Sequence, residues 1–129
     1  MSKFLIEIKK LSKQFENNNL IAKVLQDVNL NLESGKVIAL VGPSGSGKST
    51  FLHLLALLDK PTKGKIFILG NSTSNLSENK KNQIIRDYVS IIFQNNNLLS
   101  DFTALENVAL PLIIRNKSYS FSIKKAKKF

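Results

Sequence analysis

The chain has 129 residues, enough for one domain or part of one, and it contains no cysteine and one histidine, His53. These counts exclude a disulfide framework and a zinc site built from cysteine and histidine. The net charge is +10, but residues 116–129 hold five of the 19 Lys/Arg residues and none of the nine Asp/Glu residues. Such a lysine-rich run is usually solvated, so no nucleic-acid partner is expected.

The first predicted elements are a pair of antiparallel strands. Residues 4–11 and 23–32 both alternate apolar and polar side chains, as half-buried strands do. The asparagines at 17–19, between the two runs, are typical turn residues. The sequence therefore predicts a β hairpin at the start of the domain.

The next elements surround a glycine-rich segment. Residues 36–41 form a short continuous apolar run, which is typical of a strand buried on both faces. Residues 48–58 have an apolar helical face, and the turn-forming residues 59–64 are expected to end that helix. Residues 42–50 therefore link a buried strand to an amphipathic helix.

Two more strands are predicted at 65–69 and 88–93, with a polar helix at 75–86 between them. Thr103 and Glu106 fit a capping box at the start of a further helix. Two features of this last part are also expected: Pro111 ends that helix, and residues 116–129 form a basic, loosely ordered tail after a domain at 1–115.

The chemistry is carried by residues 42–50, which fill the template G-x-x-x-x-G-K-[ST] without a mismatch. Glycines let successive N–H groups point at one phosphate, and the start of a helix adds its positive dipole end. A glycine-rich turn that contains a lysine by chance is the alternative, and the flanking strand and helix argue against it. The predicted ATP-binding residues are Gly42, Pro43, Ser44, Gly45, Ser46, Gly47, Lys48, Ser49 and Thr50. Lys48 is expected to contact the β- and γ-phosphates, and the Ser49 hydroxyl to bind Mg²⁺.

This loop, with an upstream aromatic residue and a downstream Phe93–Gln94 pair, resembles the nucleotide-binding domain of ABC transporters over about residues 4–115. The resemblance implies an α/β fold, namely the N-terminal part of an ABC-type P-loop NTPase domain with an antiparallel β subdomain. It also implies that Phe15 stacks on adenine; tyrosine is more usual there, but a π face is sufficient. By the same resemblance, Gln94 contacts Mg²⁺ and the attacking water and links the site to membrane subunits.

Residues 53–64 and 98–112 are similar to the ATPase subunit of bacterial lipoprotein-releasing systems, although Ser100 replaces a usual proline and residues 95–97 depart from the pattern. Macrolide-export and cell-division ABC ATPases share the first stretch well and the second less closely. The resemblance implies an ATP-binding subunit, peripheral to the cytoplasmic face of the bacterial inner membrane, that powers release of lipoproteins toward the outer membrane. Its expected partners are transmembrane permease subunits and a second ATP-binding subunit.

The sequence contains no Leu-Ser-Gly-Gly-Gln signature, no Walker B strand ending in Asp-Glu, and no histidine switch. Residues 54–59 resemble Walker B only superficially, because a helix would carry Asp59 away from the phosphates. We therefore expect a chain truncated after the Gln94 region, in which Lys48 and Gln94 support a catalytic set that is incomplete. The open alternatives are a catalytically inactive nucleotide-binding fragment, either inert or regulatory, and the ATPase of a macrolide-export or cell-division system.

Overall fold

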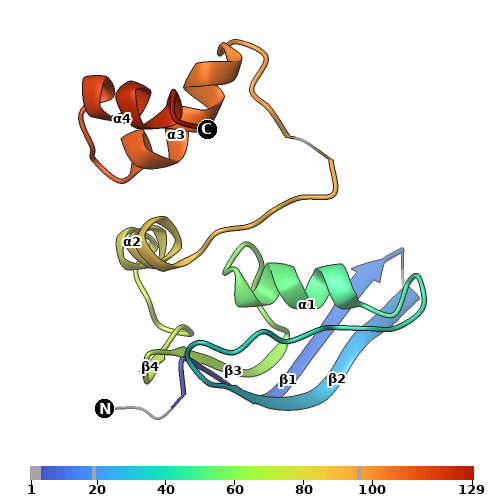
Figure 1. Cartoon of the computed structure of the whole chain (residues 1–129). Coiled ribbons are helices and arrows are strands. Elements are labelled where there is room, and N and C mark those ends of the chain that lie inside the picture. The colour runs from blue at the N-terminus through green and yellow to red at the C-terminus, as the bar shows by residue number, and fades with distance from the viewer. Residues whose placement is uncertain (1–3, 19, 96) are drawn as a thin grey trace. The chain divides into compact units, whose positions relative to one another are not determined.

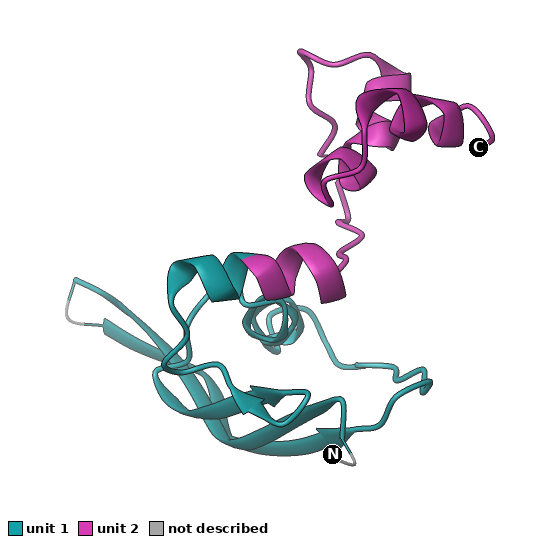
Figure 2. Cartoon of the chain, turned by 90° about the vertical axis from the view of Figure 1, so that its left-hand side faces the viewer, with its two compact units in different colours: residues 1–82 teal, residues 83–129 magenta. Residues whose placement is uncertain are grey.

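The computed structural model describes residues 4–18, 20–95 and 97–129, and the chain divides into two compact units, Met1–Asn82 and Gln83–Phe129 (Figures 1 and 2). Unit 1 contains β1 Ile6–Asn17, β2 Leu20–Leu32, α1 Lys48–Leu55, β3 Lys63–Ile68 and β4 Asn71–Ser72. Helix α2, Glu78–Tyr88, begins in unit 1 and ends in unit 2. Unit 2 also contains α3 Ala104–Ile114 and α4 Tyr119–Ala126.

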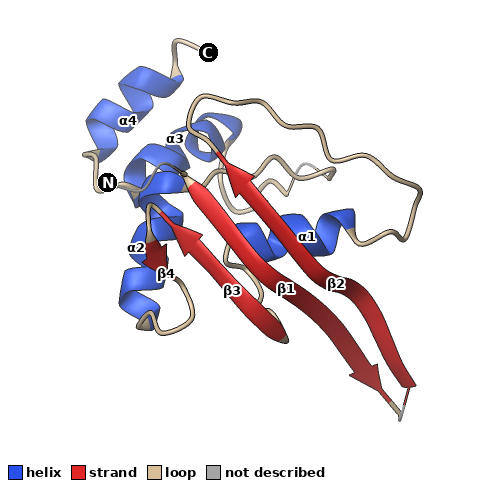
Figure 3. Cartoon of the chain, turned by 90° about the horizontal axis from the view of Figure 1, so that it is seen from below, coloured by secondary structure: helices blue, strands red, loops and turns tan. Residues whose placement is uncertain are grey.

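The strands of unit 1 form one antiparallel sheet in the order β2-β1-β3-β4 (Figure 3). The pairing of β1 with β2 confirms the predicted hairpin, whose turn residue Asn19 lies outside the described residues, and β3 confirms the strand predicted at 65–69. Helix α1 lies across one face of this sheet (Figure 1). The buried apolar side chains of unit 1 come from β1, β3, α1 and the turn after α1: Ile8, Leu11, Phe51, Leu54, Ala56, Leu57, Ile66 and Ile68.

Strand β1 contains an irregularity that buries two of its side chains together. Ile8 and Leu11 would point to opposite faces of a regular strand, yet they are only 1% and 0% exposed. The pairing register with β2 shifts between these residues, and Lys10 has a left-handed φ of 47°. Gly64, with φ 87°, approaches the Lys10 carbonyl so closely that a Cβ would collide with it. The bulge at Lys10 therefore turns both side chains into the core.

Helix α1 confirms the predicted helix, but it ends at Leu55 rather than at 59–64. The Leu58 N–H donates to the His53 carbonyl at 2.9 Å, and the Leu57 N–H donates to the Leu54 carbonyl at 3.1 Å. These are the two bonds of a Schellman motif, with Leu57 in the left-handed conformation at φ 59°. The Leu57 side chain is 5% exposed, so its burial offsets the conformational cost.

Two predicted strands, at 36–41 and 88–93, are wrong for the residues that the structure describes. Neither segment is a strand, and Tyr88 is the last residue of α2 instead. Val37 and Ile92 are 101% and 98% exposed. A strand buried on both faces needs neighbouring strands to pair its backbone groups, and the sheet of unit 1 does not extend to these segments. The polar helix predicted at 75–86 is confirmed as α2, with shifted bounds.

Helix α3 begins as predicted and ends later. Thr103 Oγ1 accepts from the Glu106 N–H at 3.3 Å, while Glu106 Oε2 accepts from the Thr103 N–H at 2.9 Å. These reciprocal bonds confirm the capping box. The helix then continues through Pro111 to Ile114, so the predicted end at Pro111 is wrong. A proline in a helix removes one backbone donor. Helix α3 packs against α4, and Ala109 is fully buried.

Residues 116–129 contain helix α4, which corrects the expectation of a loosely ordered tail. The Ser118 side chain caps the helix by accepting a backbone N–H of its first turn at 3.3 Å. Ser122 is fully buried and its hydroxyl donates to the Ser118 carbonyl at 2.9 Å. The Tyr119 hydroxyl donates to Glu106 at 3.1 Å, which ties α4 to the first turn of α3. A cap and a partner helix therefore order this basic segment, which composition alone did not reveal.

Candidate nucleotide-binding site

The loop at 42–50 leads directly into α1. Gly47 is the N-cap residue of α1 with φ 86°, and a Cβ at this position would lie 2.8 Å from Val24 Cγ1 of β2. The first intrahelical bond runs from the Phe51 N–H to the Gly47 carbonyl at 2.8 Å. The N–H groups of the first helical residues, which begin at Lys48, therefore have no intrahelical partners. Their direction and the helix dipole favour an anion at this end of α1.

Lys48 folds over the loop that precedes it. Its Nζ donates to the Gly42 carbonyl at 2.8 Å and to the Pro43 carbonyl at 2.7 Å, and it lies 3.5 Å from Ser46 Oγ. The Ser46 N–H donates to the Pro43 carbonyl at 3.3 Å, which closes the turn. The loop therefore combines backbone N–H donors with one ammonium, and this donor set suits a chain of phosphates.

The residue that follows Lys48 suits the magnesium role predicted for it. Ser49 is exposed in the first turn of α1. In the described part of the chain, no group of three or more His, Asp or Glu side chains is placed to hold a metal ion. Mg²⁺ prefers oxygen ligands and commonly takes several of them from substrate phosphates. The role of the Ser49 hydroxyl as a ligand of Mg²⁺ stays a prediction.

Phe15 lies in the same unit as the loop, near the end of β1. It pairs with Ala22 of β2, and its side chain is 45% exposed. Further along β2, Val24 and Leu25 form the surface against which Gly47 packs, because a Cβ on Gly47 would meet side-chain carbons of both. Ala22, which pairs with Phe15, therefore lies only a few residues along β2 from the side chains that contact Gly47.

Gln94 belongs to unit 2 and is exposed, in an irregular stretch that follows α2. Of the departures noted beside it in the sequence, Asn95 and Asn97 are described, and Asn96 lies outside the described residues. The contact of Gln94 with Mg²⁺ and water at the loop of unit 1 stays a prediction.

The sequence prediction passed over one residue of unit 1, Lys13. Its ammonium forms an ion pair at 2.7 Å with Asp59, just beyond the C-terminal end of α1. The hydrogen bond from Lys13 is the main cause that holds the pKa of Asp59 below its usual value. Alternation along a strand places Lys13 and Phe15 on one face, and this spacing was the available signal. Asp59 is thus a structural partner, consistent with its exclusion as a Walker B residue.

Comparisons with known proteins give one consistent family. The family described as "ABC transporter" matches residues 25–128, so the match continues beyond residue 115 into α4. The lipoprotein-releasing system ATP-binding protein LolD of Rickettsia bellii (strain RML369-C) is 44% identical over 128 residues, covering 98% of this chain and 55% of the relative. The macrolide export ATP-binding/permease protein MacB of Shewanella sp. (strain W3-18-1) is 43% identical over 120 residues, covering 93% of this chain and 18% of the relative.

Among solved structures, a dimeric structure of the ATP-binding cassette MJ0796 of Methanocaldococcus jannaschii, in a post-hydrolysis state bound to ADP and Pi, superposes with a TM-score of 0.88. It is 38% identical in sequence, and the match covers 95% of this chain and 54% of that chain. This chain therefore spans about half the length of the LolD relatives and of the cassette that it matches. None of the helices in the described part of the chain combines the length and apolar character that a membrane span requires.

Proposed function

The chain belongs to the ABC transporter family, and from this premise we propose that it binds ATP with Mg²⁺ at the loop formed by residues 42–50. The observation that carries the proposal is the position of Lys48 Nζ, within 2.8 Å of the Gly42 and Pro43 carbonyls at the N-terminus of α1. An ammonium at this end of α1, together with the N–H groups of the first helical turn, suits a negatively charged chain of phosphates.

Each part of the nucleotide has a proposed contact in this chain. The β- and γ-phosphates take the loop N–H groups and Lys48, and Mg²⁺ takes the Ser49 hydroxyl. The adenine ring stacks on Phe15, whose exposed ring is in the same unit. Gln94 is proposed to contact Mg²⁺ and the attacking water. When bound, the metal neutralises phosphate charge and fixes the geometry of the phosphate chain.

The finer proposal concerns the transport system. We propose an ATP-binding subunit of a lipoprotein-releasing system, peripheral to the cytoplasmic face of the inner membrane, that works with permease subunits and a second ATP-binding subunit. The LolD similarity over 98% of the chain supports this system, and the dimeric MJ0796 cassette supports the second subunit. The MacB similarity, at nearly the same identity, keeps a macrolide-export system as the alternative.

A second candidate function is nucleotide binding without turnover, for these 129 residues taken by themselves. The observation that favours it is the sequence itself, which has no signature loop, no Asp-Glu Walker B strand and no histidine switch. A general base and donors placed around the transferring phosphate each contribute to the rate of hydrolysis. We propose that the 129-residue chain binds ATP and does not sustain hydrolysis by itself.

The test is calorimetric titration of the purified chain with ATP and Mg²⁺, compared with Lys48→Ala. Loss of a charge-assisted contact of roughly 1.5–3 kcal/mol predicts an affinity that is lower by about tenfold or more. Lys36→Ala, an exposed lysine just ahead of the loop, is the matched control and should bind as the wild type does. Equal ATP affinity in the wild type and Lys48→Ala would contradict the binding site. Steady phosphate release that disappears in Lys48→Ala would contradict the proposed absence of turnover.

A further inference from the structure

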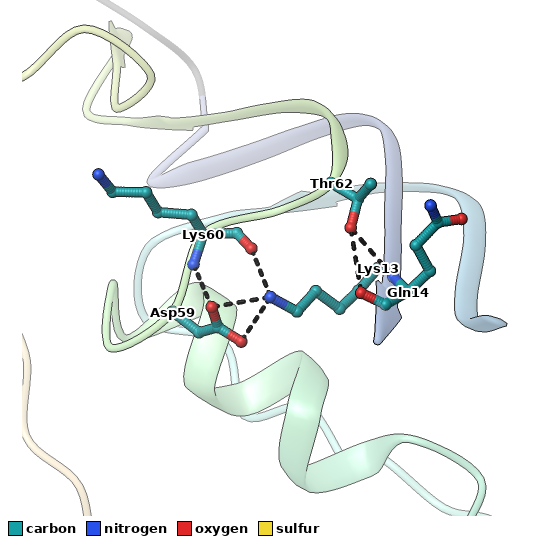
Figure 4. A network of polar contacts seen from close by, with 5 residues as sticks. All are labelled: Lys13, Gln14, Asp59, Lys60 and Thr62. Carbon is teal, nitrogen blue, oxygen red and sulfur yellow. Dashed lines mark hydrogen bonds and ion pairs between the residues drawn. The ribbon is translucent and has the colours of Figure 1, made fainter. Parts of the chain in front are cut away.

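The ammonium group of Lys13 is held by several polar contacts. Its Nζ donates to Asp59 Oδ1 at 2.8 Å and to the Lys60 carbonyl at 2.8 Å, and it lies 2.7 Å from Asp59 Oδ2 (Figure 4). The Lys13 side chain is only 12% exposed. A lysine ammonium has a small number of N–H donors, and these acceptors are enough to engage all of them. The ammonium therefore has a fixed position beside the C-terminal end of α1.

The acceptor side of this contact is also held in place. Asp59 Oδ1 accepts from the Lys60 N–H at 2.6 Å, so the carboxylate is tied to the turn that follows α1. Next to Lys13, the Gln14 N–H donates to Thr62 Oγ1 at 3.1 Å, and Figure 4 shows this contact beside the ion pair. Strand β1 is thus attached to the turn at more than one point. The attachment lies directly before Phe15 in the sequence.

The same ammonium lies over the ring of Phe15, 4.8 Å from the ring centroid. A cation at this distance is attracted by the negative face of the ring and restricts where the ring can turn. The Phe15 side chain remains 45% exposed, so ring surface is available for another partner. Across the hairpin, Lys13 pairs with Leu25, and a Cβ on Gly47 would lie 3.2 Å from Leu25 Cδ2. Lys13 is therefore linked to the C-terminal end of α1 through Asp59, and to its N-terminal end through Leu25 and Gly47.

We propose that Lys13 is a positioning residue for the nucleotide base: anchored by Asp59 at the end of the phosphate-binding helix, it holds the Phe15 ring as a fixed platform for adenine. The inference rests on the proposed ATP site and adds a specificity role to a residue outside the loop. Lys13 touches neither phosphate nor metal in this scheme. Loss of Lys13 should therefore weaken the contribution of the base to the binding affinity and leave the contribution of the triphosphate unchanged.

The test compares two ligands that differ in the base. Calorimetry of the full 129-residue chain with ATP and with inorganic tripolyphosphate, both with Mg²⁺, gives the ratio of the two affinities. Lys13→Met keeps the apolar stem and removes the charge, and it should lower the ratio by about two- to fivefold, the size of one exposed cation–π contact. Tripolyphosphate affinity should not change. Asp59→Asn keeps Lys13 but weakens its anchor, and it should lower the ratio in the same direction.

The matched control is Lys9→Met, because Lys9 Nζ also lies over an aromatic ring, 5.1 Å from the Phe67 centroid, and pairs with Glu7 on the same strand. This variant should leave the ratio unchanged. A Lys13→Met chain that keeps the wild-type ratio, or that loses affinity for both ligands equally, would overturn the positioning role. Failure of the wild type to bind either ligand would instead contradict the ATP site itself. Phe15→Ala should abolish the preference for ATP, and Lys13→Met should then have no further effect.

Discussion

A Cβ on Gly47 would lie 2.8 Å from Val24 Cγ1 and 3.1 Å from the Val24 carbonyl oxygen, so the last glycine of the loop packs directly on strand β2. Gly47 also has φ 86°, a conformation that disfavours any side chain. Two independent constraints therefore require glycine at the N-cap of α1. This contact fixes the start of the helix, and with it the direction of the donors at residues 48–50.

Gly47→Ala should therefore lower the free energy of unfolding by about 1–3 kcal/mol, because backbone strain and overpacking act together. Urea unfolding followed by circular dichroism measures the change. Gly35→Ala is the matched control: Gly35 has φ 74°, but a Cβ there would meet nothing within 4 Å. It should show the conformational cost alone, about 1 kcal/mol. Equal losses at the two positions would show that the Val24 contact is unimportant.

Ser49→Ala should reduce the gain in ATP affinity that Mg²⁺ produces. The hydroxyl is the protein ligand proposed for the metal, so its loss should lower affinity for the magnesium complex by about tenfold, equivalent to roughly 1.4 kcal/mol. Calorimetry in Mg²⁺ and in EDTA separates the effects, because affinity for metal-free ATP should not change. Ser49→Thr keeps a hydroxyl and should behave as the wild type does. A loss of the same size in EDTA would assign Ser49 to phosphate binding instead.

The features that could be predicted from the sequence are those set by neighbouring residues. The loop at 42–50 and the capping box of Thr103 and Glu106 depend on short spacings, and the capping box has the expected hydrogen bonds. The ion pair of Lys13 with Asp59 could not be predicted in this way, because it joins residues that are 46 positions apart. Its position depends on the bulge in β1 and on the left-handed turn that ends α1.

The wrong strand predictions have a related cause. Apolar runs at 36–41 and 88–93 have the composition of buried strands, but a strand also needs partners, and these come from elsewhere in a chain. In the described residues these runs are unpaired, with Val41 and Ile92 84% and 98% exposed. The opposite error occurred at 116–129, where a basic composition hid the Ser118 cap and the packing of α4 on α3.

The ion pair of Asp59 predicts a dependence of stability on pH. The pKa of Asp59 is lowered in the folded state, first by the hydrogen bond from Lys13, from a usual value of 3.8. A lowered folded pKa means that the contribution is fully present above 3.8 and is lost as the pH falls through the folded value. Because the Asp59 side chain is 36% exposed, the contribution is about 0.5–1 kcal/mol after solvent screening.

Asp59→Asn isolates this contribution from the other carboxylates. The wild type should be more stable than the variant near neutral pH, and the difference should shrink below about pH 4. Urea unfolding at several pH values measures it. The difference should also become smaller in a Lys13→Met background, because the carboxylate then has no ammonium to pair with and keeps only the hydrogen bond from the Lys60 N–H. A difference that stays constant down to about pH 2, well below the ordinary pKa of an aspartate, would rule out the ion pair as its source.

Thr103→Ala should destabilise unit 2, because Thr103 Oγ1 accepts the Glu106 N–H and also donates to Glu106 Oε2 at 2.7 Å. Loss of an N-cap hydroxyl costs about 1 kcal/mol. Glu106 also accepts from Tyr119 of α4, so release of its carboxylate should loosen both helices. Circular dichroism at about 222 nm follows helix content in urea and reports the change. Thr103→Ser keeps the cap and should retain wild-type stability, whereas equal loss in both variants would show that the methyl group, not the hydroxyl, stabilises this helix start.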